Sequence, residues 1–227
     1  MDQNALKELA AARAVELVQD GADVGLGSGS TAEIAIGMLG ERVKQGLRIR
    51  GVPTSERTAM LADLAGIPLT TLEVAPRLAI TLDGADEVDP DLNLIKGFGG
   101  ALTREKIVAR ATELEVILVD ESKLVERLGA RGVLPVEVLQ FGWTRAAAEI
   151  AELGLKPTLR RSLEGPYVTD NGGYILHLKI GPIDDPHALD ARLKQVAGVV
   201  ETGLFLGIAG LVLVGGPEGV REIARGE

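Results

Sequence analysis

The sequence has no cysteine, few aromatic side chains and no long apolar run. Without cysteine among the 227 residues, disulfides, thiol catalysis and thiolate metal sites are excluded. No run approaches the roughly 18 apolar residues of a membrane-spanning helix, and the N-terminal residues include acids and lack the apolar core of an export signal. We therefore expect a cytoplasmic protein. The net charge of −9 argues against a nucleic-acid partner, yet a local positive pocket could still bind a small anion.

The stretch from Asp83 to Val108 carries most of the reactive side chains. An apolar run at residues 78–82 predicts a buried strand, so Asp83 and Asp86 come where that strand ends. Glu105 lies in the first turn of a predicted helix. Between them runs a glycine-rich loop made of Lys96, Gly97, Phe98, Gly99 and Gly100. A carboxylate shielded from water can act as a general base and an ammonium can stabilise negative charge, so these residues indicate proton transfer on a small polar molecule.

The acids in this stretch also resemble a calcium-binding loop. Asp89, Asp91 and Asn93 have the spacing of the first three calcium ligands. Leu94, however, stands where that loop needs glycine, and Gly100 stands where it needs a bidentate glutamate. We therefore expect no metal site here.

A second informative stretch is a strand near residues 22–26, a glycine-serine loop and a helix. The loop contains Ser28, Gly29, Ser30 and Thr31. Ser30 and Glu33 have the spacing of a capping box, and Thr103 is a candidate cap for the helix that carries Glu105. Backbone N–H groups at such a helix start bind anions, although glycine also serves any tight strand-to-helix turn. The loop lacks the lysine of a P-loop and the dinucleotide spacing G-x-G-x-x-G, so no nucleotide cofactor is expected.

Alternation of strands and helices predicts a Rossmann-like α/β fold, an open parallel sheet with helices on both faces. Lys123 follows the apolar strand 115–120, just as Asp83 and the Ser28 loop follow theirs. In such sheets ligands bind at the carboxyl ends of the strands, so these residues are expected at one edge.

The pattern changes from about residue 132. Residues 132–204 read strand, helix, strand, strand, helix, strand, with a hairpin turn at residues 171–173, which predicts a smaller ferredoxin-like α+β domain. The larger domain would then comprise residues 1–131 with 205–227. Its last part is predicted as a strand at 211–214 followed by a short helix.

The ordered motifs resemble the ribose-5-phosphate isomerase family, type A. They are GLGSGSTA (25–32), TSERT (54–58), DGADE (83–87), KGFGGALTREK (96–106), DESK (120–123), LPVEV (134–138), VTDNG (168–172) and GLF (203–205). The chain departs from the family pattern at Phe98, where glycine is usual, and we expect its side chain to point outward or to cap the pocket. The resemblance implies interconversion of D-ribose 5-phosphate and D-ribulose 5-phosphate in the pentose phosphate pathway, without cofactor or metal, by a homo-oligomer that is commonly a dimer.

The resemblance also implies a role for each site residue. Glu105 would move the proton between the two sugar carbons, Lys96 would stabilise the enediolate, Asp83 would manage the hydroxyl protons, and Asp86 would assist ring opening. Lys7 could add charge at the phosphate. The residues implied to bind substrate are Ser28, Gly29, Ser30, Thr31, Asp83, Gly84, Ala85, Asp86, Lys96, Gly97, Phe98, Gly99 and Lys123.

Two other functions belong to different classes. A sugar-phosphate-sensing module, as found in transcription regulators, would need a DNA-binding segment and gives Glu105 no role, whereas the chain is acidic throughout. A nicotinamide-dependent oxidoreductase would need the full glycine fingerprint followed by an acid about 20 residues later.

Overall fold

The structure, a computed structural model, describes residues 2–226 and divides the chain into two compact units. Unit 1 comprises the chain up to Ala85, Arg104–Leu124 and the chain from Ile208. Unit 2 comprises Asp86–Thr103 and Val125–Gly207. The predicted domain limits at residues 131 and 205 stay a prediction.

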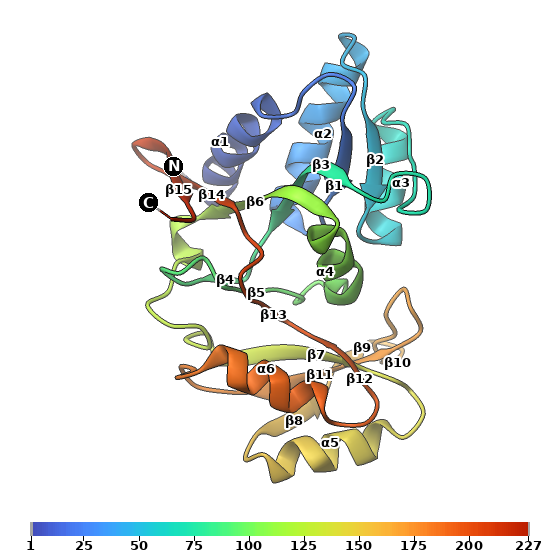
Figure 1. The fold of residues 1–227 in the computed structure, drawn as a ribbon, viewed down its shortest axis with the longest axis vertical. Coiled ribbons are helices and arrows are strands. Elements are labelled where there is room, and N and C mark those ends of the chain that lie inside the picture. The colour runs from blue at the N-terminus through green and yellow to red at the C-terminus, as the bar shows by residue number, and fades with distance from the viewer. Residues whose placement is uncertain (1, 227) are drawn as a thin grey trace. The chain divides into compact units, whose positions relative to one another are not determined.

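Unit 1 is built on a six-stranded sheet with the order β15-β14-β6-β3-β1-β2 (Figure 1). All neighbours pair in parallel except β14 and β15, which are antiparallel. The open parallel sheet predicted from the sequence is therefore confirmed, and β15 adds an antiparallel strand at its edge. Its strands are β1 (Asp23–Leu26), β2 (Arg50–Pro53), β3 (Leu78–Gly84), β6 (Thr112–Asp120), β14 (Leu211–Gly216) and β15 (Gly219–Ala224).

Helices cover both faces of this sheet, and the alternation along β1 shows which residues face which layer. Val24 and Leu26 belong to the core beneath α1 and α2. Gly25, between them, faces Val108 of α4, whose side chain would lie 2.8 Å from any Cβ at that position. Glycine on β1 thus lets α4 approach the sheet closely. The helices of this unit are α1 (Gln3–Glu16), α2 (Ser30–Lys44), α3 (Glu56–Leu64) and α4 (Leu102–Arg110), with the short 3₁₀ helix η1 at Glu121–Lys123. The first two residues of α4, Leu102 and Thr103, belong to unit 2.

The predicted C-terminal helix is wrong, because the chain there forms strand β15. Residues 216–219 make a tight turn in which Gly219 has φ of +115°, and β15 then pairs with β14 from Leu211 opposite Ala224 onward. The hydrogen bonds offered by the adjacent strand outweigh the helical spacing of this short segment. Among the described residues, no helix combines the length and the apolar character needed to cross a membrane.

Unit 2 contains a four-stranded antiparallel sheet with the order β12-β7-β11-β8. Leu176 and Leu178 of β11 pack into a core with Ala146 and Ile150 of α5 and Leu193 of α6. The elements occur in the predicted order strand, helix, strand, strand, helix, strand. They are β7 (Val133–Val138), α5 (Trp143–Glu152), β8 (Lys156–Leu159), β11 (Tyr174–Lys179), α6 (Pro186–Lys194) and β12 (Val199–Thr202).

Two small sheets complete unit 2. One is three-stranded, with the order β13-β5-β4, and the other is the hairpin β9-β10 inserted between β8 and β11. Their strands are β4 (Glu87–Val88), β5 (Leu94–Ile95), β9 (Arg161–Ser162), β10 (Gly165–Pro166) and β13 (Leu204–Phe205). The segment from Asp86 to Thr103 thus belongs to unit 2 although most of that unit lies later in the chain.

Candidate active site

Asp83 lies at the carboxyl end of β3 with 0 % of its surface exposed. Its Oδ1 accepts hydrogen bonds from the backbone N–H groups of Ser28 (3.1 Å) and Gly84 (2.7 Å). A Cβ on Gly27 would lie 2.3 Å from the same Oδ1, so only glycine allows the loop after β1 to approach this carboxylate. Unit 1 therefore brings together Asp83 and the glycine-serine loop, two segments that the sequence predicts at one sheet edge.

The N-terminus of α2 is open and positively charged. Gly29 is the N-cap with φ of +100°, and no side chain caps the helix. The predicted capping box is wrong: Ser30 Oγ accepts a hydrogen bond from Lys7 Nζ at 3.0 Å, and Glu33 pairs with Arg57, whose hydrogen bond lowers the pKa of that carboxyl. Free helix N–H groups beside a lysine ammonium suit a phosphate.

A cluster of hydroxyl groups lies behind this loop, and sequence reasoning gave it no role. Ser28 Oγ lies 2.8 Å from Thr54 Oγ1, 2.9 Å from Ser55 Oγ and 3.1 Å from Thr58 Oγ1. These partners follow the end of β2, which pairs with β1 next to the loop. The available signal was the hydroxyl-rich TSERT motif at the carboxyl end of a neighbouring strand. The hydroxyl of Ser28 thus lies within hydrogen-bonding distance of three other hydroxyls.

Glu105 lies in the first turns of α4 and exposes only 4 % of its surface. It lies three residues before Val108, so the two side chains share the helix face that packs on Gly25 of β1. Because α4 leads into β6, which runs parallel to β3, the start of α4 lies toward the carboxyl ends of these strands. Glu105 and Asp83 therefore belong to the same end of the unit 1 sheet.

Lys123 ends η1, directly after β6, and so lies at the same sheet edge as Asp83. Asp120 caps η1 by accepting a hydrogen bond from the Ser122 N–H at 2.9 Å. It also accepts a hydrogen bond from Gln3 Nε2 at 3.1 Å. Burial acts to raise the pKa of Asp120, but the hydrogen bonds from Ser122 and Gln3, with the charge of Lys123, lower it overall. An ionised Asp120 thus orders the turn that presents Lys123.

Unit 2 brings together Asp86, Lys96 and the glycine loop. Lys96 exposes 2 % of its surface, and its Nζ lies 5.4 Å from the centre of the Phe205 ring. Its backbone N–H donates to Gly203 O at 2.9 Å, and a Cβ on Gly203 would lie 2.4 Å from Lys96 O. Asp86 Oδ2 accepts the Phe98 N–H at 3.1 Å, so this acid also holds the loop.

Phe98 leaves the backbone of the loop in place. Its side chain is 38 % exposed, and its ring centre lies 6.4 Å from that of His177 on β11. Gly97 takes φ of +104° and its carbonyl accepts the Gly100 N–H at 2.9 Å, which closes a tight turn. The turn that Lys96 precedes is thus formed with a phenylalanine at its second position.

Two buried carboxylates of unit 2, Glu87 and Glu137, accept hydrogen bonds from segments far from them in the sequence. Glu87 of the DGADE motif accepts the N–H groups of Gly129 (2.6 Å) and Arg131 (2.7 Å). Glu137 accepts the hydroxyl of Thr103 and, at 2.5 Å, that of Thr169. The prediction that Thr103 caps α4 is therefore wrong, because α4 already begins at Leu102 and this hydroxyl bonds Glu137 instead.

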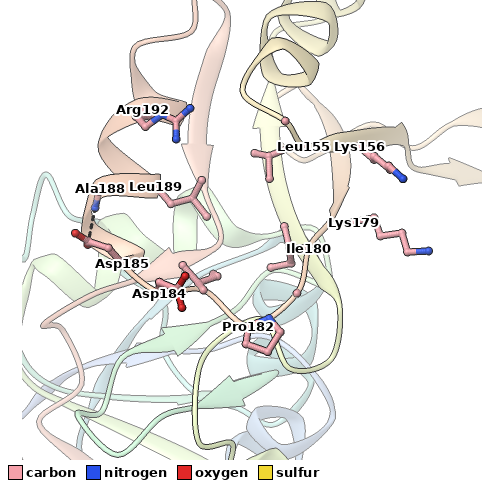
Figure 2. Close-up of a pocket in the computed structure, with 13 residues that line it drawn as sticks. Leu155, Lys156, Lys179, Ile180, Pro182, Asp184, Asp185, Ala188, Leu189 and Arg192 are labelled. Atoms are coloured by element: carbon pink, nitrogen blue, oxygen red, sulfur yellow. Dashed lines mark hydrogen bonds between the residues drawn. The ribbon is translucent and has the colours of Figure 1, made fainter.

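A hollow of about 540 Å³ in unit 2 includes none of the predicted site residues. It lies between the ends of β8 and β11 and the start of α6, and in Figure 2 the side chains of Lys156 and Lys179 extend away from α6. Side chains of both charges line it, with Asp184 and Asp185 at the start of α6 and Lys156, Lys179 and Arg192 around them. In the part of the chain that the structure describes, no cluster of three or more acids or histidines could hold a metal ion.

Known proteins resemble this chain over its whole length. The family model for ribose 5-phosphate isomerase A (phosphoriboisomerase A) matches residues 50–219. A ribose-5-phosphate isomerase A from Gloeobacter violaceus is 52 % identical over 224 residues, covering 98 % of this chain and 97 % of the relative.

Solved structures agree with this result. A D-ribose-5-phosphate isomerase in complex with phospho-erythronic acid is 41 % identical with a TM-score of 0.96, covering 99 % of this chain and 100 % of that one. A ribose 5-phosphate isomerase A from Methanocaldococcus jannaschii is 41 % identical with a TM-score of 0.93, covering 97 % and 98 %.

Proposed function

Because the chain belongs to the ribose 5-phosphate isomerase A family, we propose that it interconverts D-ribose 5-phosphate and D-ribulose 5-phosphate in the pentose phosphate pathway. The observation that carries the proposal is this full-length relationship, together with the buried Asp83 beside an open helix N-terminus. The relative's complex with a sugar-acid phosphate supports a sugar phosphate as the ligand.

Glu105 is the base of the proposed reaction. Its carboxylate removes the proton from C2 of the open-chain aldose, and the electron pair of that C–H bond moves through C1 onto O1 to give a cis-enediolate. The same carboxyl then returns the proton to C1. Burial of Glu105 at the start of α4 supports this role, because a carboxylate shielded from water is the stronger base.

Lys96 and the glycine loop stabilise the enediolate. The negative charge on the enediolate oxygens is met by the Lys96 ammonium and by loop N–H groups such as those of Gly97 and Gly99, while the Phe98 N–H stays on Asp86. A donor of this kind contributes about 3 kcal/mol to the transition state. Support comes from the burial of Lys96 and the closed turn that follows it.

Asp83 and Asp86 handle the remaining protons. Asp83, beside Gly84 and Ala85, carries the hydroxyl proton from O2 to O1, so that C2 becomes the ketone and C1 the alcohol. Asp86 assists opening of the furanose ring. Asp83 accepts hydrogen bonds from two backbone N–H groups and Asp86 from one. These bonds favour ionised carboxylates, which supports a role for both in accepting protons from the substrate hydroxyls.

The phosphate group binds at the loop that begins α2. Backbone N–H groups of Gly29, Ser30 and Thr31, next to Ser28, supply hydrogen bonds, while Lys7 and Lys123 supply charge. The bond from Lys7 to Ser30 supports this placement. The reaction needs neither cofactor nor metal in this proposal, and the cytoplasmic location and the homodimer remain predictions.

The proposal is tested by following conversion of ribose 5-phosphate in chelator-treated buffer with wild type and Glu105→Gln. We expect turnover to fall by about a thousandfold or more while substrate still binds, because the amide keeps the shape of the side chain and loses only the base. Glu113→Gln is the matched control, since it removes the same charge from an exposed residue of β6 and should leave turnover unchanged.

Two outcomes would contradict the proposal. Glu105→Gln with turnover close to wild type would remove Glu105 from the role of base. Wild type that binds ribose 5-phosphate without converting it would instead support a sugar-phosphate-sensing module.

A further inference from the structure

The glycine loop of unit 2 is held from two sides. On one side, Asp86 accepts the Phe98 N–H and Gly97 O accepts the Gly100 N–H. Glycine peptides have little conformational preference of their own, so a loop that must present N–H donors in a fixed direction needs further contacts. The carbonyl groups of Phe98 and Gly99 supply them.

Arg160 and Tyr167 bind these two carbonyls. Arg160 Nη1 donates to Phe98 O at 2.8 Å, and Tyr167 Oη donates to Gly99 O at 3.2 Å. The guanidinium carbon of Arg160 lies 3.8 Å from the centre of the Tyr167 ring, and the Tyr167 N–H bonds Arg160 O at 3.0 Å. The two side chains therefore form one stacked pair, and we call Arg160 and Tyr167 the clamp.

Gly100 shows how closely the clamp approaches the loop. A Cβ at this position would lie 2.5 Å from Tyr167 Oη, and Gly100 has φ of +95°. Glycine is thus needed for contact with the tyrosine ring as well as for its own backbone conformation.

The clamp lies on a surface hairpin of unit 2. Arg160 lies between β8 and β9, Tyr167 follows β10, and both residues are half-buried. Neither belongs to the apolar core that α5 and α6 form with the four-stranded sheet. Substitutions in the clamp should therefore change the conformation of the loop more than they change the stability of unit 2.

A planar trans peptide points its C=O and the next N–H in opposite directions. Fixing Phe98 O on Arg160 therefore turns the Gly99 N–H away from Arg160. We propose that Arg160 and Tyr167 are positioning residues for the isomerase reaction: they pin the Phe98 and Gly99 carbonyls and so aim the Gly99 N–H and hold Lys96. The inference rests on the proposed function, because it assigns the loop the task of stabilising the enediolate.

The experiment compares kcat and KM for ribose 5-phosphate among wild type, Arg160→Met, Tyr167→Phe and Arg161→Met. Arg161→Met is the matched control, because Arg161 is exposed on the same hairpin and loses the same charge. Arg160→Met should lower kcat by about tenfold or more with KM within about threefold, since a displaced donor weakens the transition state more than the bound substrate. Arg161→Met should match wild type.

Three variants separate a positioning role of the clamp from a purely structural one. Tyr167→Phe removes one hydrogen bond and keeps the ring against Gly100 and Arg160, and it should lower kcat by about threefold. Arg160→Ala should regain part of its kcat when guanidinium is added at a non-denaturing concentration, because a free guanidinium can occupy the place of the lost side chain. The kcat of Arg160→Lys should be lower than that of Arg160→Ala with added guanidinium, since an ammonium lacks the planar stacking surface.

Each result has a defined meaning. A folded Arg160→Met with the kcat of Arg161→Met would overturn the proposal, and so would a loss confined to KM, which would make Arg160 a direct substrate ligand. If Arg160→Met does not fold, Tyr167→Phe decides, and wild-type kcat in that variant would overturn the clamp. A wild-type protein without isomerase activity would refute the proposed function instead.

Discussion

The two glycine loops of this protein are fixed in different ways. The loop from Gly27 to Thr31 follows β1, and its neighbours come from the adjacent strands: Asp83 lies near the end of β3 and Thr54 follows β2. The loop from Lys96 to Gly100 is held by Asp86 and by Arg160 and Tyr167, and the last two lie 62 and 68 positions beyond the carbonyls they bind. The order of strands in the sheet fixes the neighbours of the first loop, whereas the conformation of the second depends on a few side chains distant in the sequence.

The difference between the two loops is tested most strongly by a glycine-to-alanine substitution in each. Gly27→Ala should reduce the free energy of unfolding by about 3 kcal/mol, because its Cβ would lie 2.6 Å from the Asp83 Cα and the backbone must shift. Activity should fall as well, since the same shift displaces Asp83. Urea unfolding with an activity assay on the folded fraction measures both effects.

Gly99→Ala is the control in the other loop. No heavy atom lies within 4 Å of a Cβ built there, so the change in unfolding free energy should stay within about 0.5 kcal/mol. Equal stability losses in the two variants would mean that the first loop is no more constrained by packing than the second.

Contacts set by the sheet topology could be predicted from the sequence, whereas contacts made by distant side chains could not. Asp83, Lys123 and the glycine-serine loop could be assigned to one edge, because each comes at or just after the end of a strand and a parallel sheet places all its carboxyl ends together. The order of elements in unit 2 also followed from hydrophobic pattern and a hairpin signal at residues 171–173. In both cases a periodic local pattern and a general rule of topology were enough.

The remaining contacts depend on pairings that no local pattern reveals. The S-x-x-E spacing at Ser30 predicted a cap, yet Lys7 binds that hydroxyl and Arg57 takes Glu33. Residues 219–224 had helical spacing but form β15, because β14 offers them a strand to pair with. The contacts of Arg160 with Phe98 could not be foreseen, since a lone arginine beside a hairpin has no distinguishing spacing.

A smaller effect sharpens the account of the first loop. Ser28→Ala should reduce the free energy of unfolding by about 1–2 kcal/mol, because it removes a hydroxyl shared with Thr54, Ser55 and Thr58. The KM for ribose 5-phosphate should change by less than about threefold, since the phosphate meets backbone N–H groups in our proposal. Lys7→Met should show the opposite pattern, with KM raised and stability little changed. A large rise in KM for a fully stable Ser28→Ala would place its hydroxyl on the phosphate.

The smallest expected effect concerns the side chains around the second loop. Burial first, and then the charge of Arg160, lower the pKa of His177 below its usual 6.5. As the pH falls through 6.5, the unfolded chain binds a proton that the folded protein does not yet accept, so this residue makes the free energy of unfolding decrease toward acid. Above pH 6.5 the imidazole is neutral in both states and the contribution vanishes.

His177→Gln should therefore lose less stability than wild type between pH 7.5 and pH 5.5 in urea titrations. His187→Gln removes the other histidine, which is exposed at the start of α6, and should keep the wild-type dependence. If both variants follow the wild-type curve, His177 titrates as in the unfolded chain. Neither burial on β11 nor the charge of Arg160 would then disfavour the protonated imidazole, and the contact between Phe98 and His177 would shield that ring from water less than the structure indicates.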